Sequence, residues 1–295
     1  MISFIFEAAD APHHARTDAG TDSRSSLLQL ARSRRLYTLL QGLLQLLLDV
    51  KNETVRKALY GVEVAVVNST DDIEERLQSP DSVFSALRDE LQRNPQIVGF
   101  FACFEPDYYP TEGRSFQPYA FWSGNRIDTM QISRTGNDYL EDDWYRRALA
   151  VDSGYWSEPY MDDAGSGKPM CTYSVPIHDR TGRKVGVFGA DISLDWLYGK
   201  LRAIDKEYSF FKGFVKNTKN IDTLSIFSSS IIIDSVGTFI VHPDKKRILV
   251  DNFYEELRQQ KDTASLQLLK DISRCRYCHT PKSRRWVLSC NSTPR

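Results

Sequence analysis

The order of apolar and polar residues predicts two helices followed by a strand. From 36 to 78, apolar residues recur at three- and four-residue steps, which is the period of an amphipathic helix. The segment 79–95 opens with the helix-capping sequence Ser79-Pro80-Asp81 and ends at Asn94-Pro95, so it predicts a shorter second helix. The β-branched and aromatic residues of 97–106 then predict a strand.

The middle of the chain has the pattern of antiparallel strands joined by turns. It predicts one hairpin over 120–132, around Ser123-Gly124-Asn125. A second hairpin is predicted from CTYSVPIHD and KVGVFGADI, which flank Arg180-Thr181-Gly182-Arg183. Short helices are expected at 138–150 and at 193–204, the latter capped by Ser193.

A weaker copy of this order follows the second hairpin. The pattern predicts strand, turn and strand over 230–243, and a helix over 253–272. The tail 274–295 continues no recognisable period. The expected fold class is therefore α+β, with a long N-terminal helix and two unequal units built on antiparallel sheets.

Composition excludes several function classes. With a net charge of −1, no global field favours nucleic acid, and we expect no nucleic-acid partner. No P-loop, GxSxG or HExxH motif occurs, so we expect a protein that is not an enzyme and uses no cofactor. The best membrane-span candidate, 36–50, contains Gln41 and Gln45 and is shorter than the ~20 apolar residues a span needs. We therefore expect a soluble chain.

The segment WYRRALAVDSGYWSEPYMDD, residues 144–163, carries the most chemical information. Aromatic walls with a few placed polar groups are typical of a small-molecule pocket. No nucleophile lies beside a base here, which favours a site that senses a ligand over one that converts it. The alternative is a purely structural role, in which Trp144, Tyr145 and Tyr160 are ordinary core aromatics that cap the sheet.

The chain resembles the double Cache family of extracytoplasmic sensor domains, most clearly over 97–249. The motifs that carry this resemblance are GFFACFEPDYYP (99–110), Trp144-Tyr145, WSEPYMDD (156–163), TYSVPI (172–177), GVFGADISLDWL (186–197) and GTFIVHPDKKRIL (237–249). The resemblance implies a long N-terminal helix and two PAS-like antiparallel-sheet subdomains. It also implies a small-molecule sensor from a bacterial transmembrane signal-transduction protein, similar to the sensor regions of PPM-type serine phosphatases and histidine kinases.

On this basis we expect five regions. They are a poorly ordered or non-native segment at 1–48, the long and short helices at 49–95, the membrane-distal pocket domain at 96–204, a partial membrane-proximal domain at 205–273, and an irregular tail at 274–295. The intact family implies a periplasmic domain of an inner-membrane protein, with a homodimer through the long N-terminal helix as one arrangement. The second subdomain is expected to be incomplete and the output module absent. The alternatives are a non-functional gene fragment, or the N-terminal part of a phosphatase or kinase.

The resemblance also implies a ligand site. The amino-acid-binding members of the family have aromatic residues and an aspartate at positions that match Tyr139, Trp144, Tyr145, Tyr160 and Asp191. Where those members have an arginine, this chain has Asp142, which cannot hold a carboxylate by a bidentate fork. We therefore expect a cationic or neutral small-molecule ligand, unless Arg146 or Arg147 turns into the site.

Two aspartates keep open alternatives. Asp191 ends an apolar strand and precedes a helix, so it could accept from a ligand amine or from backbone N–H groups at that helix start. Asp162, with Asp163, is either a solvated turn or a contact to a ligand or cation.

The cysteines suggest chemistry that we do not favour. Cys275-Arg276-Tyr277-Cys278-His279 matches the pattern of haem attachment, and with Cys290 it has zinc-ligand types, but an accident of the unusual tail is the preferred interpretation. Cys171 and His178 are expected on opposite faces of one strand, which argues against a catalytic pair. We expect no metal site.

Overall fold

The computed structural model describes residues 2–6, 23–132, 138–162, 167–207, 230–234 and 236–259. The proposed haem or zinc residues Cys275, Cys278, His279 and Cys290 lie outside this part of the chain. Asp163 and the second half of the helix expected at 253–272 lie outside it as well.

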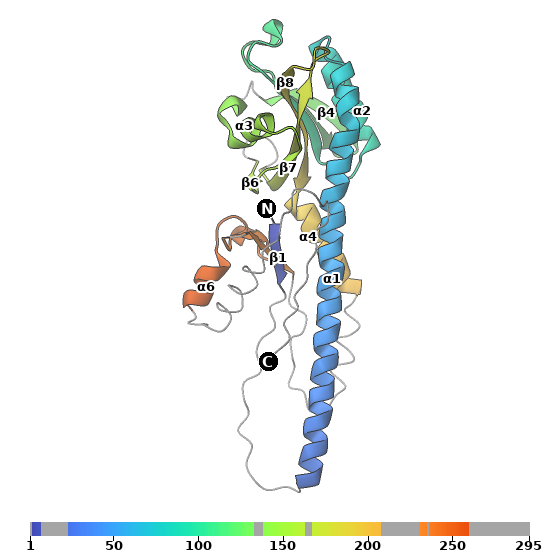
Figure 1. Ribbon diagram of the computed structural model, residues 1–295, viewed down its shortest axis with the longest axis vertical. Coiled ribbons are helices and arrows are strands. Elements are labelled where there is room, and N and C mark those ends of the chain that lie inside the picture. The colour runs from blue at the N-terminus through green and yellow to red at the C-terminus, as the bar shows by residue number, and fades with distance from the viewer. Residues whose placement is uncertain are drawn as a thin grey trace.

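The first helix, α1, runs without interruption from Ser23 to Glu75. It passes alongside both folded units of the molecule (Figure 1). Residues 23–48, which belong to the segment expected to be poorly ordered or non-native, are part of this helix. They are rich in leucine, arginine and glutamine, which are strong helix formers. The boundary expected at residue 49 therefore falls inside α1.

The central unit is a seven-stranded antiparallel sheet in the order β4-β3-β2-β8-β7-β5, with β6 also paired to β7. Its strands are β2 (Gly99–Phe104), β3 (Pro118–Ser123), β4 (Arg126–Gln131), β5 (Tyr155–Trp156), β6 (Tyr160–Met161), β7 (Pro169–His178) and β8 (Lys184–Ser193). Both predicted hairpins are confirmed, as β3–β4 and β7–β8. The short strands β5 and β6 were not predicted.

The helices around this sheet begin where the sequence places caps. In α2 (Pro80–Arg93), the Ser79 hydroxyl accepts from the backbone N–H of Ser82 at 3.2 Å. In α4 (Leu194–Glu207), the Ser193 hydroxyl accepts from the backbone N–H of Trp196 at 3.4 Å. The short helix expected at 138–150 is present as a 3-10 turn, Tyr139–Glu141, followed by α3 (Asp143–Ala150). Another 3-10 turn lies at Pro110–Glu112.

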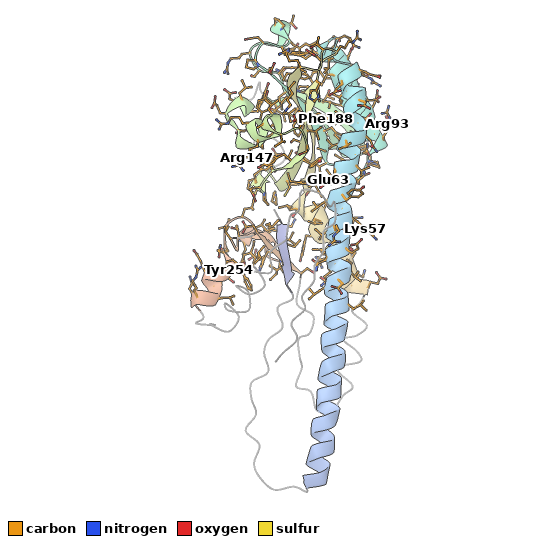
Figure 2. All side chains as sticks on the ribbon, in the orientation of Figure 1. Lys57, Glu63, Arg93, Arg147, Phe188 and Tyr254 are labelled. Atoms are coloured by element: carbon orange, nitrogen blue, oxygen red, sulfur yellow. The ribbon has the colours of Figure 1, made fainter. Side chains whose placement is uncertain are left out.

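The two faces of the sheet pack against different elements. Helices α1, α2 and α4 cover one face, here called the core face, and α3 covers the other, here called the site face. On the core face Phe188 stacks on Phe100 with ring centroids 5.4 Å apart, and neither is exposed. Phe188 lies inside the central unit, whereas Arg147 of α3 projects from the outer side of this unit (Figure 2).

The second unit has a small three-stranded sheet. Its strands are β9 (Ile231–Asp234), β10 (Phe239–Val241) and β1 (Ile2–Phe6), with β9 in the middle. A 3-10 turn at Lys245–Arg247 and α6 (Phe253–Gln259) complete the described part. The predicted strand-turn-strand is confirmed, whereas the pairing of the N-terminal strand β1 with β9 was not predicted.

The polar contacts of α1 include three that join it to α4 and to the seven-stranded sheet. Lys51 is completely buried, and its Nζ lies 2.6 Å from Asp205 Oδ1 of α4. Trp156 Nε1 donates to Glu63 Oε1 at 2.8 Å, and the backbone N–H of His178 donates to Glu74 Oε1 at 2.7 Å. Within the described residues, no helix is long and apolar enough to cross a membrane.

Candidate functional site

The most unusual polar group on the site face is the carboxylate of Asp191, near the end of β8. Its side chain lies beside Thr172, its direct partner on β7, and Gly99, its partner on β2. Asp191 is only 7% exposed. Thr172 donates to its Oδ1 at 2.7 Å and Tyr160 donates to the same atom at 3.5 Å, and the Tyr119 hydroxyl bonds the carboxylate as well. Asp191 therefore points into the sheet's site face and is not bonded to the start of α4.

The carboxylate of Asp191 has no cationic partner among the described residues, since all three of its partners are hydroxyl groups. Burial raises its pKa to about 6, against hydrogen bonds from Thr172 and Tyr119 that lower it. The nearby charge of Asp162 raises this pKa further. A second carboxylate where a counter-ion would be expected makes the region electrostatically suited to a cation.

An aromatic cluster lies next to these polar groups on the same face. Phe101 of β2 meets Trp144 edge to face at 5.4 Å, and Trp144 meets Tyr145 edge to face at 6.1 Å. Tyr145 in turn contacts Tyr139 at 5.0 Å. The structure thus brings the predicted aromatic residues of 139–145 onto the face that carries Asp191.

Two of the predicted site residues have internal partners. The Tyr139 hydroxyl donates to the backbone carbonyl of Phe104 at 2.6 Å and accepts from the backbone N–H of Phe116 at 3.2 Å, so it joins two segments of the chain. The Asp142 carboxylate accepts from Trp144 Nε1 at 3.0 Å. Asp142 therefore orients the indole of Trp144.

Asp142 and Asp191 both act on the buried thiol of Cys103. Burial raises the pKa of this thiol well above its usual value, and the charges of the two aspartates raise it further. Both negative charges therefore act on the same buried group of the site face. Burial and the charge of Asp191 raise the pKa of the Tyr160 hydroxyl, and the charge of Asp162 raises it further.

The arginines next to Trp144 do not replace the missing cation. The Arg146 guanidinium donates to the backbone carbonyl of Glu141 at 2.6 Å and is more than half exposed. Arg147 is exposed on the outer side of α3.

Two buried hydroxyl groups on this side of the sheet have no hydrogen-bond partner within the described part of the chain. They are Ser174 Oγ of β7 and Tyr145 Oη of α3. Ser174 is 1% exposed and Tyr145 is 3% exposed. Buried hydroxyls in folded proteins are nearly always paired, so each of these groups points to a partner that is not part of the described chain.

Sequence reasoning missed the hydroxyl groups that accompany Asp191. Thr172 and Ser174 alternate along the predicted strand TYSVPI, so they share one face by the period of two. That signal was available, but only the register Thr172↔Asp191 shows that they share the face of the carboxylate. Tyr119 reaches Asp191 because it passes over Gly99, where any Cβ would lie 2.3 Å from the tyrosine oxygen.

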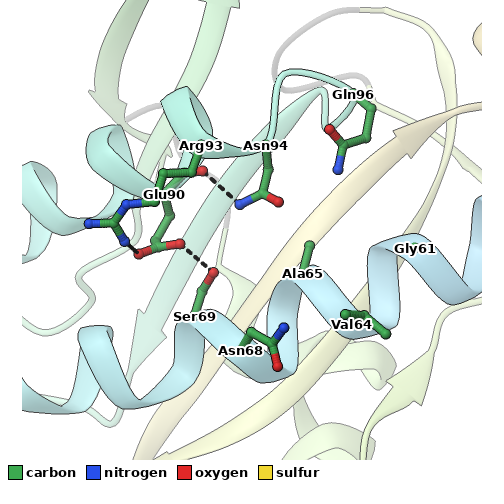
Figure 3. A pocket seen from close by; sticks show the side chains of 9 residues that line it. All are labelled: Gly61, Val64, Ala65, Asn68, Ser69, Glu90, Arg93, Asn94 and Gln96. Carbon is green, nitrogen blue, oxygen red and sulfur yellow. Dashed lines mark hydrogen bonds and ion pairs between the residues drawn. The ribbon is translucent and has the colours of Figure 1, made fainter.

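A separate cavity of about 370 Å³ lies between α1 and α2 (Figure 3). Its polar wall is a satisfied network in which Ser69 donates to Glu90 at 2.5 Å, and Arg93 pairs with Glu90 and with Asp72. None of the predicted site residues lines it. It lies on the helix-covered side of the sheet, opposite to Asp191.

The described residues form no group of side chains suited to a metal ion. Cys171 is buried in the core, and burial raises the pKa of its thiol to about 12. His178 is bound to Glu74 of α1. His242 accepts from the backbone N–H of Asp244 at 3.0 Å, which is a structural role.

Comparison with known families decides what kind of domain this is. Residues 83–198 match the family model described as the methyl-accepting chemotaxis protein-like, first PDC sensor domain. This part of the chain is therefore similar to PDC sensor domains. The matched range contains the whole seven-stranded sheet, most of α2, all of α3 and the start of α4. The predicted resemblance to Cache-type sensors is confirmed.

Solved structures show the same fold over more of the chain. The chain is 24% identical to the extracellular domain of the proposed histidine kinase soHK1S-Z6, with 82% of this chain and 83% of that chain covered and a TM-score of 0.60. It is 18% identical to a protein described as methyl-accepting chemotaxis protein X, with 79% and 84% covered and a TM-score of 0.59. No curated protein sequence matches the chain significantly.

These comparisons confirm the α+β fold class with an N-terminal helix and PAS-like sheets. The matched family model and the similar structures are sensor domains, which agrees with the role predicted from the sequence. The family is one of sensor domains and not of catalytic domains. The division of the chain into five regions and the choice of site residues stay predictions.

Proposed function

We propose that this protein is the ligand-binding part of a bacterial membrane-bound signal receptor, and that the ligand binds at Asp191 on the site face of the PDC domain. The observation that supports this is a buried carboxylate whose partners are only hydroxyl groups. Burying a charge is costly unless it is paired. A ligand that supplies the missing cation would offset this cost.

The proposed ligand is a small cationic molecule, with a neutral molecule as the second choice. Asp162 and Asp142 add negative charge to the region around Asp191. At an effective dielectric constant of ~20, two unit charges 4 Å apart interact by about 4 kcal/mol before desolvation is subtracted, which is enough to select the sign of a ligand. Trp144, Tyr145 and Tyr160 would form the aromatic wall, and Tyr139 would support that wall from behind.

Calorimetry with charged probes tests this proposal. We expect n-pentylamine to bind the wild-type protein and not the Asp191→Asn variant, while acetate and glutamate bind weakly or not at all. A matched control is Asp244→Asn, which changes an aspartate in the second unit. Tight glutamate binding that survives in Asp142→Ala would overturn the charge selectivity. Absence of binding by every amine would overturn the site.

We further propose that the receptor forms a homodimer through α1. Apolar side chains are exposed along one side of this helix at Leu46, Tyr60, Val64 and Val67. Between them, Glu53 and Lys57 are exposed and 3.8 Å apart, so a second copy of the same helix could pair with both charges. The spacing of three and four residues is the one by which helices pack along a seam.

Sedimentation velocity distinguishes a dimer from a monomer. Tyr60→Lys is expected to shift the protein to the monomer, because Tyr60 is 64% exposed on this seam. Val250→Lys is the control, since Val250 is 75% exposed in the second unit. A wild-type protein that stays monomeric at high concentration, or a dimer that both variants retain, would rule out this interface.

The proposed location of the domain is outside the cytoplasm, in the periplasm, as part of an inner-membrane protein. The similar kinase structure is an extracellular domain, which supports this placement. In this proposal the PDC domain carries no enzymatic activity and uses no cofactor, and the output is produced by another part of the receptor. Fusing an alkaline phosphatase reporter after residue 295 would test on which side of the membrane this domain lies.

A further inference from the structure

We propose that the ligand of this site carries a hydroxyl group as well as a cationic nitrogen, and that Ser174 binds this hydroxyl. The ligand class is therefore an amino alcohol in which three or four carbons separate the two groups. This inference rests on the proposed function, the binding of an amine at Asp191.

The positions of the two polar groups follow from the strand register. Asp191 pairs directly with Thr172, and the next pair on the same face of these strands is Gly189 with Ser174. Two residues along a strand are about 7 Å apart, so Ser174 lies one such step from the carboxylate. An extended chain of three or four carbons between nitrogen and oxygen spans a step of this length.

The hydroxyl of Ser174 differs from its neighbour in having no partner. Thr172 donates to Asp191 at 2.7 Å, whereas Ser174 Oγ is buried without a partner among the described residues. Nothing in the strand pattern requires a polar residue at position 174. Its neighbours Tyr173 and Val175 lie on the core face, and the next position on the site face is Pro176. A buried, unpaired hydroxyl lowers stability, and a ligand hydroxyl would remove this cost.

The surroundings of Ser174 suit the carbon chain of such a ligand. Gly189, its partner on β8, has no side chain, and the ring of Phe101 fills the space over it, since a Cβ there would lie 2.6 Å from that ring. In the proposed complex this ring turns aside to admit the carbon chain of the ligand. On the other side Ser174 pairs with Tyr155 of β5. Methylene groups between the two polar ends would lie against these aromatic rings. The site thus has a charged end, an apolar middle and a hydroxyl end.

The test compares two ligands of the same shape. In 4-amino-1-butanol a hydroxyl replaces the terminal methyl of n-pentylamine. A purely apolar pocket favours n-pentylamine because it has more apolar surface. We expect the opposite order in the wild-type protein by calorimetry, with 4-amino-1-butanol about fivefold tighter, the ratio expected for one hydrogen bond. In Ser174→Ala this preference should be lost, while n-pentylamine binding changes by less than about twofold.

Controls keep the outcomes separate. Ser123→Ala, at the β3–β4 turn, should retain the wild-type preference. If n-pentylamine binds the wild-type protein as tightly as the amino alcohol, or if Ser174→Ala keeps the preference, the inference is wrong although the amine site stands. If neither ligand binds, the amine site itself is refuted and this inference with it. Should Ser174→Ala fail to fold, the ratio measured on the wild-type protein still decides.

Discussion

The same strands carry two faces of opposite character. On the core face, Phe100, Phe188 and Ala190 are completely buried against α1, α2 and α4. On the site face, the neighbouring positions of the same strands are Phe101, Gly189 and Asp191, where aromatic rings adjoin a carboxylate and unpaired hydroxyls. Because side chains alternate along a strand, one residue stabilises the fold and the next can bind a ligand.

The difference shows where the free energy of folding is gained and where part of it is lost. The core face gains from the burial of closely packed apolar surface. The site face loses through the burial of Asp191 and Ser174 without full pairing. Residues that lower stability without a ligand are expected at functional sites, and the following predictions test whether the two faces differ in this way.

The largest effect is expected from Phe188→Ala on the core face. This change removes a fully buried ring that stacks on Phe100 and should lower the free energy of unfolding by about 3–5 kcal/mol. Urea denaturation followed by circular dichroism measures it. The comparison variant is Phe121→Ala on the site face, which is half-buried and should cost less. Equal losses in both variants would contradict the contrast between the faces.

Asp191→Asn should change stability in the opposite direction. The pKa of Asp191 is about 6 in the folded protein against 3.8 in the unfolded chain, so the folded state binds the proton more tightly. The stability of the wild-type protein should therefore fall as pH rises from about 4 to about 6 and stay low above that. At pH 7 the asparagine variant is expected to be more stable by about 1–3 kcal/mol, because two pKa units correspond to about 3 kcal/mol and altered hydrogen bonds subtract about 1.

Denaturation curves of both proteins at pH 4, 5, 6 and 7 check this prediction. The slope between pH 4 and pH 6 should be flatter in Asp191→Asn. A variant that is less stable than the wild-type protein at pH 7 would show that the buried carboxylate is well paired in the fold.

Ligand affinity should depend on the same titration with the opposite sign. Only the ionised carboxylate attracts an ammonium group, so n-pentylamine should bind more tightly as pH rises from 4 to 6 and then level off. The affinity is expected to change by about tenfold per pH unit well below pH 6. Calorimetry across this range measures it, and an affinity that is constant from pH 4 to pH 7 would place the cation elsewhere.

The smallest effect is expected at the border between the faces. Trp156→Phe keeps an aromatic ring on the core face but removes the N–H group that donates to Glu63 of α1, together with part of the indole ring. The hydrogen bond itself should contribute about 1 kcal/mol, the typical value for one such bond. A double-mutant cycle with Glu63→Ala isolates this hydrogen bond from the packing of the ring. No coupling between the two changes would mean that this contact does not hold α1 to the sheet.

Local patterns predicted the elements of this fold well, and long-range pairing poorly. The cap at Ser79 and the turn Arg180-Thr181-Gly182-Arg183 are local signals, and both helix α2 and hairpin β7–β8 are present. The pairing of β1 with β9 joins segments from opposite ends of the chain, so no local pattern reports it. The long helix was predicted only from residue 36, where the amphipathic period starts. It begins earlier because the residues before 36 are also good helix formers, although they lack that period.

The candidate site shows the same limit. Aromatic and acidic residue types pointed to Trp144 and Asp191, which the structure places on one face. The hydroxyls of Thr172 and Tyr119 could not be assigned to Asp191 from the sequence, because their contacts depend on register and on the missing side chain of Gly99. The bond between Tyr139 and the Phe104 carbonyl depends on how a loop crosses the sheet.

The alternation along β8 also limits how this gene can change in length. One codon inserted between Gly186 and Asp191 would rotate the carboxylate onto the side of Phe100 and Leu197 and turn an apolar neighbour toward the ligand. The same insertion in the turn at 180–183, where Gly182 has a φ of 81°, leaves every strand position in phase. Related genes should therefore vary in length at this turn. The number of residues between the end of the turn and Asp191 should change only in steps of two, if it changes at all.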